Sequence, residues 1–166
     1  MANQLIAEDR IFADHYQFYI YDSQVDILDY LGKDDIPMVG AHIGEIPKGI
    51  HTFIMVTTVA DLNDHWLKIY QSDNAPNLDG YDYSVCVKFR VESGTITING
   101  LEPMMDANIP SGVYDMYVCA RNLGVDPTDE QNELSNDDFK QAQVESYEIY
   151  FVSKVQNNSN VIKLFS

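Results

Sequence analysis

Apolar and polar side chains alternate from Tyr83 to Val91, the most regular stretch of this 166-residue sequence. One side of this stretch carries Tyr83, Val85, Val87, Phe89 and Val91, and the other carries Ser84, Cys86, Lys88 and Arg90. A period of two predicts a β-strand with one buried face. Similar alternation predicts two further strands, at Val113–Arg121 and at Glu145–Ser153.

Two other stretches are rich in aromatic and β-branched residues, which favour strands. We expect one continuous strand from Ile11 to Tyr21, and a central strand buried on both faces from Ile50 to Val59, where apolar residues are nearly continuous. Ser93-Gly94 predicts a tight hairpin turn into a strand at Thr95–Ile98. Val161–Phe165 is expected to add a short edge strand.

The intervals between these stretches are polar. Asp22–Asp35 is expected to be a loop, and so is Asp61–Asp82 around a short apolar stretch at Trp66–Tyr70. Gly124–Gln143 is expected to hold a short helix near its end, with Ser135 as N-cap. The pattern predicts a mainly β protein: a single domain over residues 1–166, an antiparallel β-sandwich or open barrel, with at most one or two short helices and a polar tail from about residue 156.

Charge restricts the possible partners. The sequence has 26 Asp and Glu against 10 Lys and Arg, a net charge of −16. Such a field repels nucleic acid and anionic lipid and attracts basic proteins, so we expect neither a nucleic-acid nor a membrane partner. The hydrophobic content of 45% distinguishes the chain from a disordered acidic tail. No signal peptide or membrane span is evident, and the two cysteines, Cys86 and Cys119, are expected to be reduced thiols of a cytoplasmic protein.

Most of the excess acid falls in three clusters, which we interpret as contact surfaces because self-repulsion of this size is easier to understand when a partner uses it. The main predicted partner-binding cluster is Asp126, Asp129, Glu130, Glu133, Asp137 and Asp138, and the second is Asp22, Asp26, Asp29, Asp34 and Asp35. Tyr19 and Tyr21, beside Asp22, are predicted as contact residues or core.

The remaining cluster, Asp73, Asn77, Asp79 and Asp82, is the alternative: an irregular calcium loop. Aligned as an EF-hand on Gly80, its first and twelfth ligand positions fall on Ala75 and Cys86, which are wrong for a hard cation. The four histidines are scattered without zinc-ligand spacing. No nucleophile elbow, phosphate loop or Cys–His frame is present, so we expect no catalytic residue, no metal and no cofactor.

Three short segments resemble the competence-locus DNA-entry nuclease inhibitors, the ComJ-like proteins. They are Phe12–Phe18, Ile109–Tyr114 and Tyr147–Phe151. The resemblance implies a small acidic β protein that binds and blocks a nuclease, either a competence nuclease or a toxin domain. The chain differs from that pattern in its long Asp61–Asp82 region and its extended tail.

The leading functional hypothesis is therefore a non-enzymatic inhibitor or immunity protein that occludes a basic nuclease or toxin. A calcium-dependent or carbohydrate-binding β-sandwich module using residues 73–82 is the alternative. A β-fold hydrolase with a carboxylate pair is the third possibility, although abundant carboxylates make any chosen pair uninformative.

Overall fold

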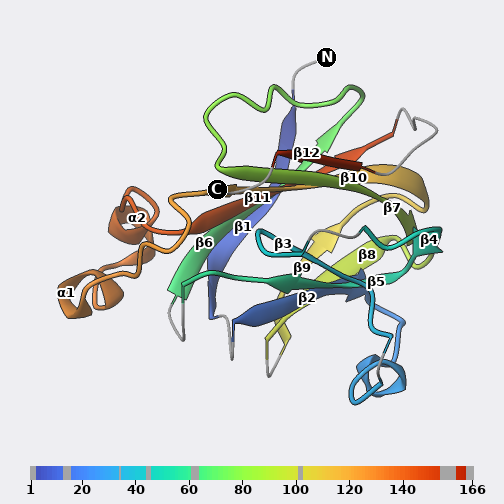
Figure 1. Ribbon diagram of the computed structural model, residues 1–166, viewed down its shortest axis with the longest axis horizontal. Helices are drawn as coiled ribbons and strands as arrows, with labels where there is room; N and C mark the ends of the chain where they lie inside the picture. Colours follow the sequence, from blue (N-terminus) through green and yellow to red (C-terminus); the bar gives the residue numbers. More distant parts are fainter. Residues whose placement is uncertain are drawn as a thin grey trace.

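The computed structural model describes residues 3–12, 16–33, 35–43, 46–60, 64–100, 103–153 and 160–163, and these form two facing β-sheets (Figure 1). The larger sheet has the order β1-β6-β11-β10-β7-β12, and β4 also pairs with β7: β1 Gln4–Phe12, β4 Ile50–His51, β6 Asp64–Ser72, β7 Tyr83–Val91, β10 Gly112–Arg121, β11 Ser146–Val152 and β12 Asn160–Lys163. The smaller sheet has the order β3-β5-β2-β8-β9: β2 Gln17–Asp22, β3 Met38–Gly40, β5 Phe53–Thr57, β8 Thr95–Asn99 and β9 Pro103–Asn108. The helices are short: the 3₁₀ turn η1 Ile27–Asp29, α1 Asp129–Asn132 and α2 Asn136–Phe139.

The main hydrophobic core fills the space between the two sheets. Alternate residues of β7, β10 and β11 enter it from the larger sheet, and alternate residues of β2, β5 and β8 enter from the smaller one, which is the packing of a β-sandwich. The five apolar residues of β7 predicted to point inward are all buried. The predicted mainly β sandwich is therefore confirmed, with mixed rather than purely antiparallel sheets, because β6–β11, β3–β5 and β4–β7 pair in parallel.

Each sheet is also partly covered on its outer face. Residues 22–38 fold over the smaller sheet, where Tyr30 stacks on Phe53 with ring centroids 4.3 Å apart. The loop between β6 and β7 covers part of the larger sheet with Tyr81 and Leu78. The cover over the smaller sheet explains the nearly continuous apolar sequence of β5, which is buried on both faces as predicted.

Four expectations about individual elements are wrong. The predicted single strand from Ile50 to Val59 is divided between β4, which pairs with β7 in the larger sheet, and β5, which belongs to the smaller sheet. The stretch from Ile11 to Tyr21 is not one strand but the end of β1 and the start of β2, which belong to different sheets. Ser93-Gly94 does not form a hairpin, because β8 pairs with β2 and β9 rather than with β7. Trp66–Tyr70, assigned to a polar loop, lies within β6, an interior strand of the larger sheet.

The Ser93-Gly94 turn instead carries the chain from one sheet to the other, and Asp22 fixes it. Asp22 is 1% exposed, and its Oδ2 accepts hydrogen bonds from the backbone N–H groups of Glu92 (2.6 Å) and Ser93 (2.9 Å). Gly94 allows the turn because its φ of 82° is unfavourable for other residues. Burial by itself raises the pKa of Asp22, but the hydrogen bonds from Ser93, Gln24 and Glu92 outweigh it and lower the pKa below its ordinary value.

Asp22→Asn is expected to destabilise the fold by about 2 kcal/mol at neutral pH, because the charged acceptor is replaced by an amide whose NH₂ group faces backbone donors. A lowered folded-state pKa means that the wild-type advantage is complete above the unfolded pKa of about 3.9 and is lost as the pH falls through the folded value. Urea unfolding of both proteins from pH 7 to pH 3 measures this. A gap in unfolding free energy that stays constant with pH would contradict the assigned role.

Candidate functional site

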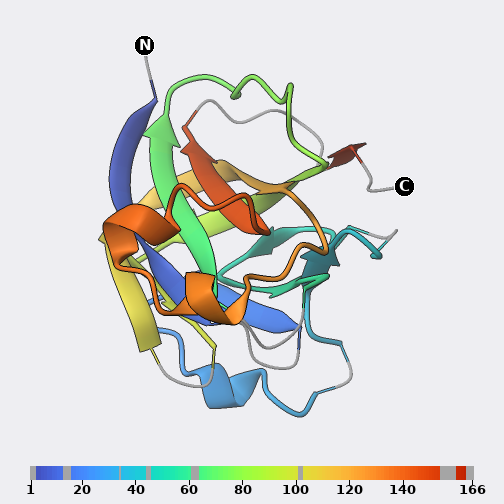
Figure 2. The same cartoon turned by 90° about the vertical axis from the view of Figure 1, so that its left-hand side faces the viewer.

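The main predicted acidic cluster forms a distinct projection, which we call the acidic arm: residues 125–140, between β10 and β11, with helices α1 and α2. It lies at one end of the molecule (Figure 1), and both helices face the viewer in front of the strands when that end is seen directly (Figure 2). All six predicted carboxylates are exposed. Among the described residues, no basic side chain lies within ion-pair distance of Asp129, Glu130 or Glu133, and Lys140 is 3.7 Å from Asp137.

Both helices of the arm begin with side-chain caps. The predicted cap is confirmed, since the Ser135 hydroxyl accepts from the backbone N–H of Asp138 at 3.3 Å. Helix α1 was not predicted, although its signal is present in the sequence: Thr128 and Gln131 form a reciprocal capping box. Short capped helices place acidic residues at their first turns, where the backbone N–H groups stabilise negative charge.

Arg10 on β1 holds the arm against the larger sheet. Its guanidinium donates to the backbone carbonyls of Leu134 (3.0 Å) and Gln131 (3.4 Å). The same group lies 3.9 Å from the centre of the Phe139 ring, a cation–π distance, and its Nε is 3.3 Å from Asp64. Phe139 is fully buried against Trp66. The arm is therefore a supported structure and not a free loop.

Glu145 holds the root of the arm from inside the protein. This fully buried carboxylate accepts hydrogen bonds from the backbone of Gly124 (2.8 Å) and Ala60 (2.9 Å) and from the hydroxyl of Tyr147 (2.7 Å). Its own backbone N–H donates to Val125 at 3.0 Å. Burial and the neighbouring carboxylate of Glu145 raise the pKa of Tyr147 well above its ordinary value, so this hydroxyl remains a donor.

The second predicted cluster lies at the opposite end of the long axis of the molecule, around η1 (Figure 1). Asp26, Asp29 and Asp35 are exposed there, whereas Asp34 lies outside the described residues. Asp35 borders two adjoining hollows of about 410 and 540 Å³. The main and the second predicted clusters therefore lie on separate parts of the surface.

Three residues predicted in or beside that cluster are not on the surface. Asp22 is the buried carboxylate that fixes the turn between the sheets, and Tyr19 and Tyr21 are 6% and 5% exposed under residues 22–38. Their assignment as partner-binding residues is therefore wrong. For the two tyrosines, the expected alternative, core, is the correct one, because η1 and its flanks cover this face of β2.

The proposed calcium loop has a different role. Asp82 accepts from the backbone of Leu123, Asp73 from the hydroxyl of Ser153, and Asn77 from the backbone of Asp79. Within the described ranges, which include all four proposed ligands, no three His, Cys, Asp or Glu side chains lie close enough together to hold a metal ion. The geometry gives the calcium-binding alternative no support, and the loop serves instead as the cover of the larger sheet.

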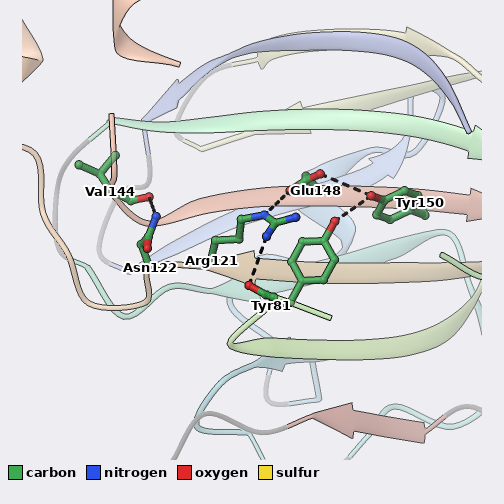
Figure 3. A network of polar contacts seen from close by, with 7 residues as sticks. Tyr81, Arg121, Asn122, Val144, Glu148 and Tyr150 are labelled. Carbon is green, nitrogen blue, oxygen red and sulfur yellow. Dashed lines mark hydrogen bonds and ion pairs between the residues drawn. The ribbon is translucent and has the colours of Figure 1, made fainter. Parts of the chain in front are cut away.

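A polar network joins this loop to the outer face of the larger sheet (Figure 3). The Arg121 guanidinium donates to Glu148 (2.9 Å) and to the carbonyl of Gly80 (3.2 Å), and it lies 4.1 Å from the centre of the Tyr81 ring. The hydroxyls of Tyr81 and Tyr150 are 2.8 Å apart. Burial raises the pKa of both tyrosines, so the hydroxyls stay protonated and act as structural hydrogen-bonding groups.

The two cysteines lie on neighbouring strands of this face and are both free. Cys86 pairs with Tyr117 in the register and Cys119 with Ser84, so the two thiols are offset diagonally. Burial raises the pKa of Cys86 to about 11 and that of Cys119 to about 12. These values make both thiols poor nucleophiles at neutral pH.

The residues that build this region are the ones that sequence patterns did not reveal. Arg10 and Glu145 carry no motif, and each acts on a segment far away in the chain. Lys68 was obscured because β6 was taken for a loop, so its place opposite Glu148 in the sheet was not foreseen. The alternation of buried His65, Leu67 and Ile69 within β6 was a usable signal.

Comparison with solved structures shows what this fold is similar to. The crystal structure of ComJ from Bacillus subtilis, an inhibitor of the DNA-degrading activity of NucA, matches with a TM-score of 0.61 at 11% sequence identity, covering 92% of this chain and 99% of ComJ. A structure of crocagin biosynthetic gene J matches with a TM-score of 0.52, also at 11% identity, over 90% of this chain and 98% of that one. The fold resembles that of ComJ.

No protein-family model and no curated protein matches the sequence. At 11% identity the structural matches establish the fold alone. A shared fold does not establish a function, which depends on the residues at the surface of this chain. Across the described part of the chain, no helix has the length and apolar character needed to cross a membrane.

Arg10→Ala should loosen the arm without unfolding the sheets. Loss of two charge-assisted hydrogen bonds is expected to lower the local opening free energy of residues 131–139 by about 2 kcal/mol, which is roughly thirtyfold faster amide exchange. Hydrogen exchange measured by mass spectrometry tests this, with Arg90→Ala, an exposed cation of β7, as the control. Equal exchange of the arm in the two variants would contradict the role of Arg10.

Neither thiol should react with a disulfide reagent in the folded protein at pH 8, because both are buried and almost entirely protonated at that pH. In denaturant both should react, giving two equivalents per chain. Rapid labelling of the native protein would contradict the buried assignment. Failure to label the denatured, unreduced protein would reveal a disulfide.

Proposed function

We propose that this chain is a non-enzymatic, cytoplasmic inhibitor that binds a basic nuclease, either a DNA-processing enzyme or a nuclease toxin domain, and blocks its DNA-binding surface with the acidic arm. The observation that carries the proposal is the set of uncompensated carboxylates on the arm: Asp129, Glu130 and Glu133 have no cation to neutralise them among the described residues. The fold shared with ComJ is consistent with such a role.

The physical basis is competition for the same positive surface. A nuclease must attract phosphate, and a row of carboxylates on a rigid support offers charge of the same sign as the DNA backbone. Because Arg10, Phe139 and Glu145 already fix the arm, binding costs little ordering of the chain. Complementary charge of this kind mainly raises the rate of association with the partner.

The arm also offers apolar contact. Val125 and Leu134, which lie at its beginning and middle, are 44% and 36% exposed. An acidic surface that also presents aliphatic side chains can steer a basic partner and then bury apolar area against it. This combination favours a protein partner over a simple cation.

The direct experiment is capture followed by an activity assay. The immobilised chain is expected to retain a basic nuclease from the native lysate, and the free chain should then stop that nuclease from degrading DNA. NucA, the target of ComJ, is the first purified nuclease to assay. If no retained or purified nuclease loses DNA-degrading activity at saturating concentrations of the chain, the proposed function is wrong.

The triple variant Asp129→Lys, Glu130→Lys and Glu133→Lys should slow association with such a nuclease by about ten- to a thousandfold at low salt and flatten the salt dependence of the association rate. Dissociation should change less. None of the three side chains makes a hydrogen bond or ion pair with another described residue, so the sheets should remain intact. Surface plasmon resonance over a salt series measures both rates.

The matched control carries the same change in net charge elsewhere: Asp73→Lys, Asp79→Lys and Glu92→Lys, all exposed and outside both predicted partner-binding clusters. This control variant should associate with the nuclease nearly as fast as the wild type does. If the two triple variants slow association equally, only the net charge matters, and the assignment of the contact to the acidic arm fails.

A further inference from the structure

A polar pocket of about 310 Å³ lies at the root of the acidic arm. Its walls are β6, the end of β10, the start of β11 and the residues that follow α2. Three of the ten basic residues in the sequence line it: Lys68, Arg121 and Lys140. Because the net charge of the chain is −16, a pocket lined by three basic residues is unusual for this protein.

Lys68 is the most informative of the three. In the sheet register it lies between Glu8 of β1 and Glu148 of β11, so a carboxylate flanks it on each side. Both carboxylates are engaged elsewhere: Glu8 accepts from the indole Nε1 of Trp66 at 2.9 Å, and Glu148 accepts from Arg121 at 2.9 Å. Lys68 is half-buried and makes no ion pair with any residue that the structure describes.

The other two cations are arranged differently. Arg121 is fixed in place by Glu148, the carbonyl of Gly80 and the ring of Tyr81 (Figure 3), so its position does not depend on a ligand. Lys140 has only Asp137, 3.7 Å away and 95% exposed, which is a weak, solvent-screened pair. The ammonium groups of Lys68 and Lys140 therefore line the pocket without a strong ion pair, beside the Arg121 guanidinium and its partner Glu148, whose carboxylate also lines the pocket.

We propose that this pocket binds the oxyanion group of a small molecule, a carboxylate or a phosphate, through Lys68 and Lys140. The exposed amides of Gln141 and Gln143 line the same pocket and supply neutral donors. A bound oxyanion would relieve the repulsion among the three cations. The volume is at the lower limit for small-molecule sites, which suits a compact anion.

The protein contains its own reporter, because its single tryptophan, Trp66, lines the pocket. We expect inorganic phosphate or succinate, titrated at constant ionic strength against sodium chloride, to change the Trp66 fluorescence saturably, with a dissociation constant on the order of 1 mM. Phosphate and succinate in separate titrations distinguish the two oxyanion classes. A change that does not saturate, or that sodium chloride reproduces, overturns the proposal.

Lys68→Gln should weaken the binding of the effective anion by about ten- to a hundredfold, since one charge-assisted hydrogen bond is lost. Lys48→Gln removes the same charge at the far end of the molecule, where Lys48 borders the 410 Å³ hollow, and should bind as the wild type does. Thermal melts confirm that both variants fold. If Lys68→Gln binds the anion as tightly as Lys48→Gln does, Lys68 is not a ligand and the site is wrong. The result is independent of nuclease inhibition.

Discussion

The buried carboxylate of Glu145 is the interaction on which the arrangement of this protein depends. It accepts hydrogen bonds from the segment that follows β5, from the turn after β10 and from Tyr147 near the start of β11. Its backbone carbonyl also accepts from the ring Nδ1 of His65 on β6, at 2.9 Å. A carboxyl group buried to this degree is tolerated only when such donors satisfy it. One side chain thus connects the two sheets and sets where the acidic arm leaves them.

The arm that Glu145 anchors carries part of the chain's large negative charge. The uncompensated carboxylates stand on a projection, where water screens them, and the sandwich below contributes apolar packing. Arg10 completes the support by binding backbone carbonyls of the arm rather than its carboxylates, so the arm is held without being neutralised. A structure that fixes acidic groups while leaving them uncompensated is suited to presenting them to a partner.

Sequence patterns were sufficient where local alternation and burial agree. They located β7, β10 and β11 closely, because each buries one clean face in the main core. They failed where contacts between residues distant in the sequence determine whether a side chain is buried. Asp22 looked like part of an exposed acidic run, yet it is buried because its backbone donors come from Glu92 and Ser93, seventy positions away or more. Tyr19 and Tyr21 are core only because residues 22–38 fold over them.

The candidate site, too, could be predicted only where local sequence composition reveals it. The arm's carboxylates were visible in the composition of residues 126–138, whereas its support and the neighbouring pocket were not. Arg10, Lys68 and Glu145 are single residues without motifs, and their roles arise from strand register and from contacts across the sandwich.

A nuclease inhibitor and the product of a biosynthetic gene share this fold at 11% identity, so the scaffold alone does not select a function. This chain pairs an acidic arm with a pocket lined by three basic residues at its root, and Lys140 belongs to both. An oxyanion bound to Lys140 would compete with Asp137 for the same ammonium group and would leave a further carboxylate of the arm uncompensated. Occupancy of the pocket would therefore increase the negative field that the arm presents, and the two sites would be electrostatically coupled.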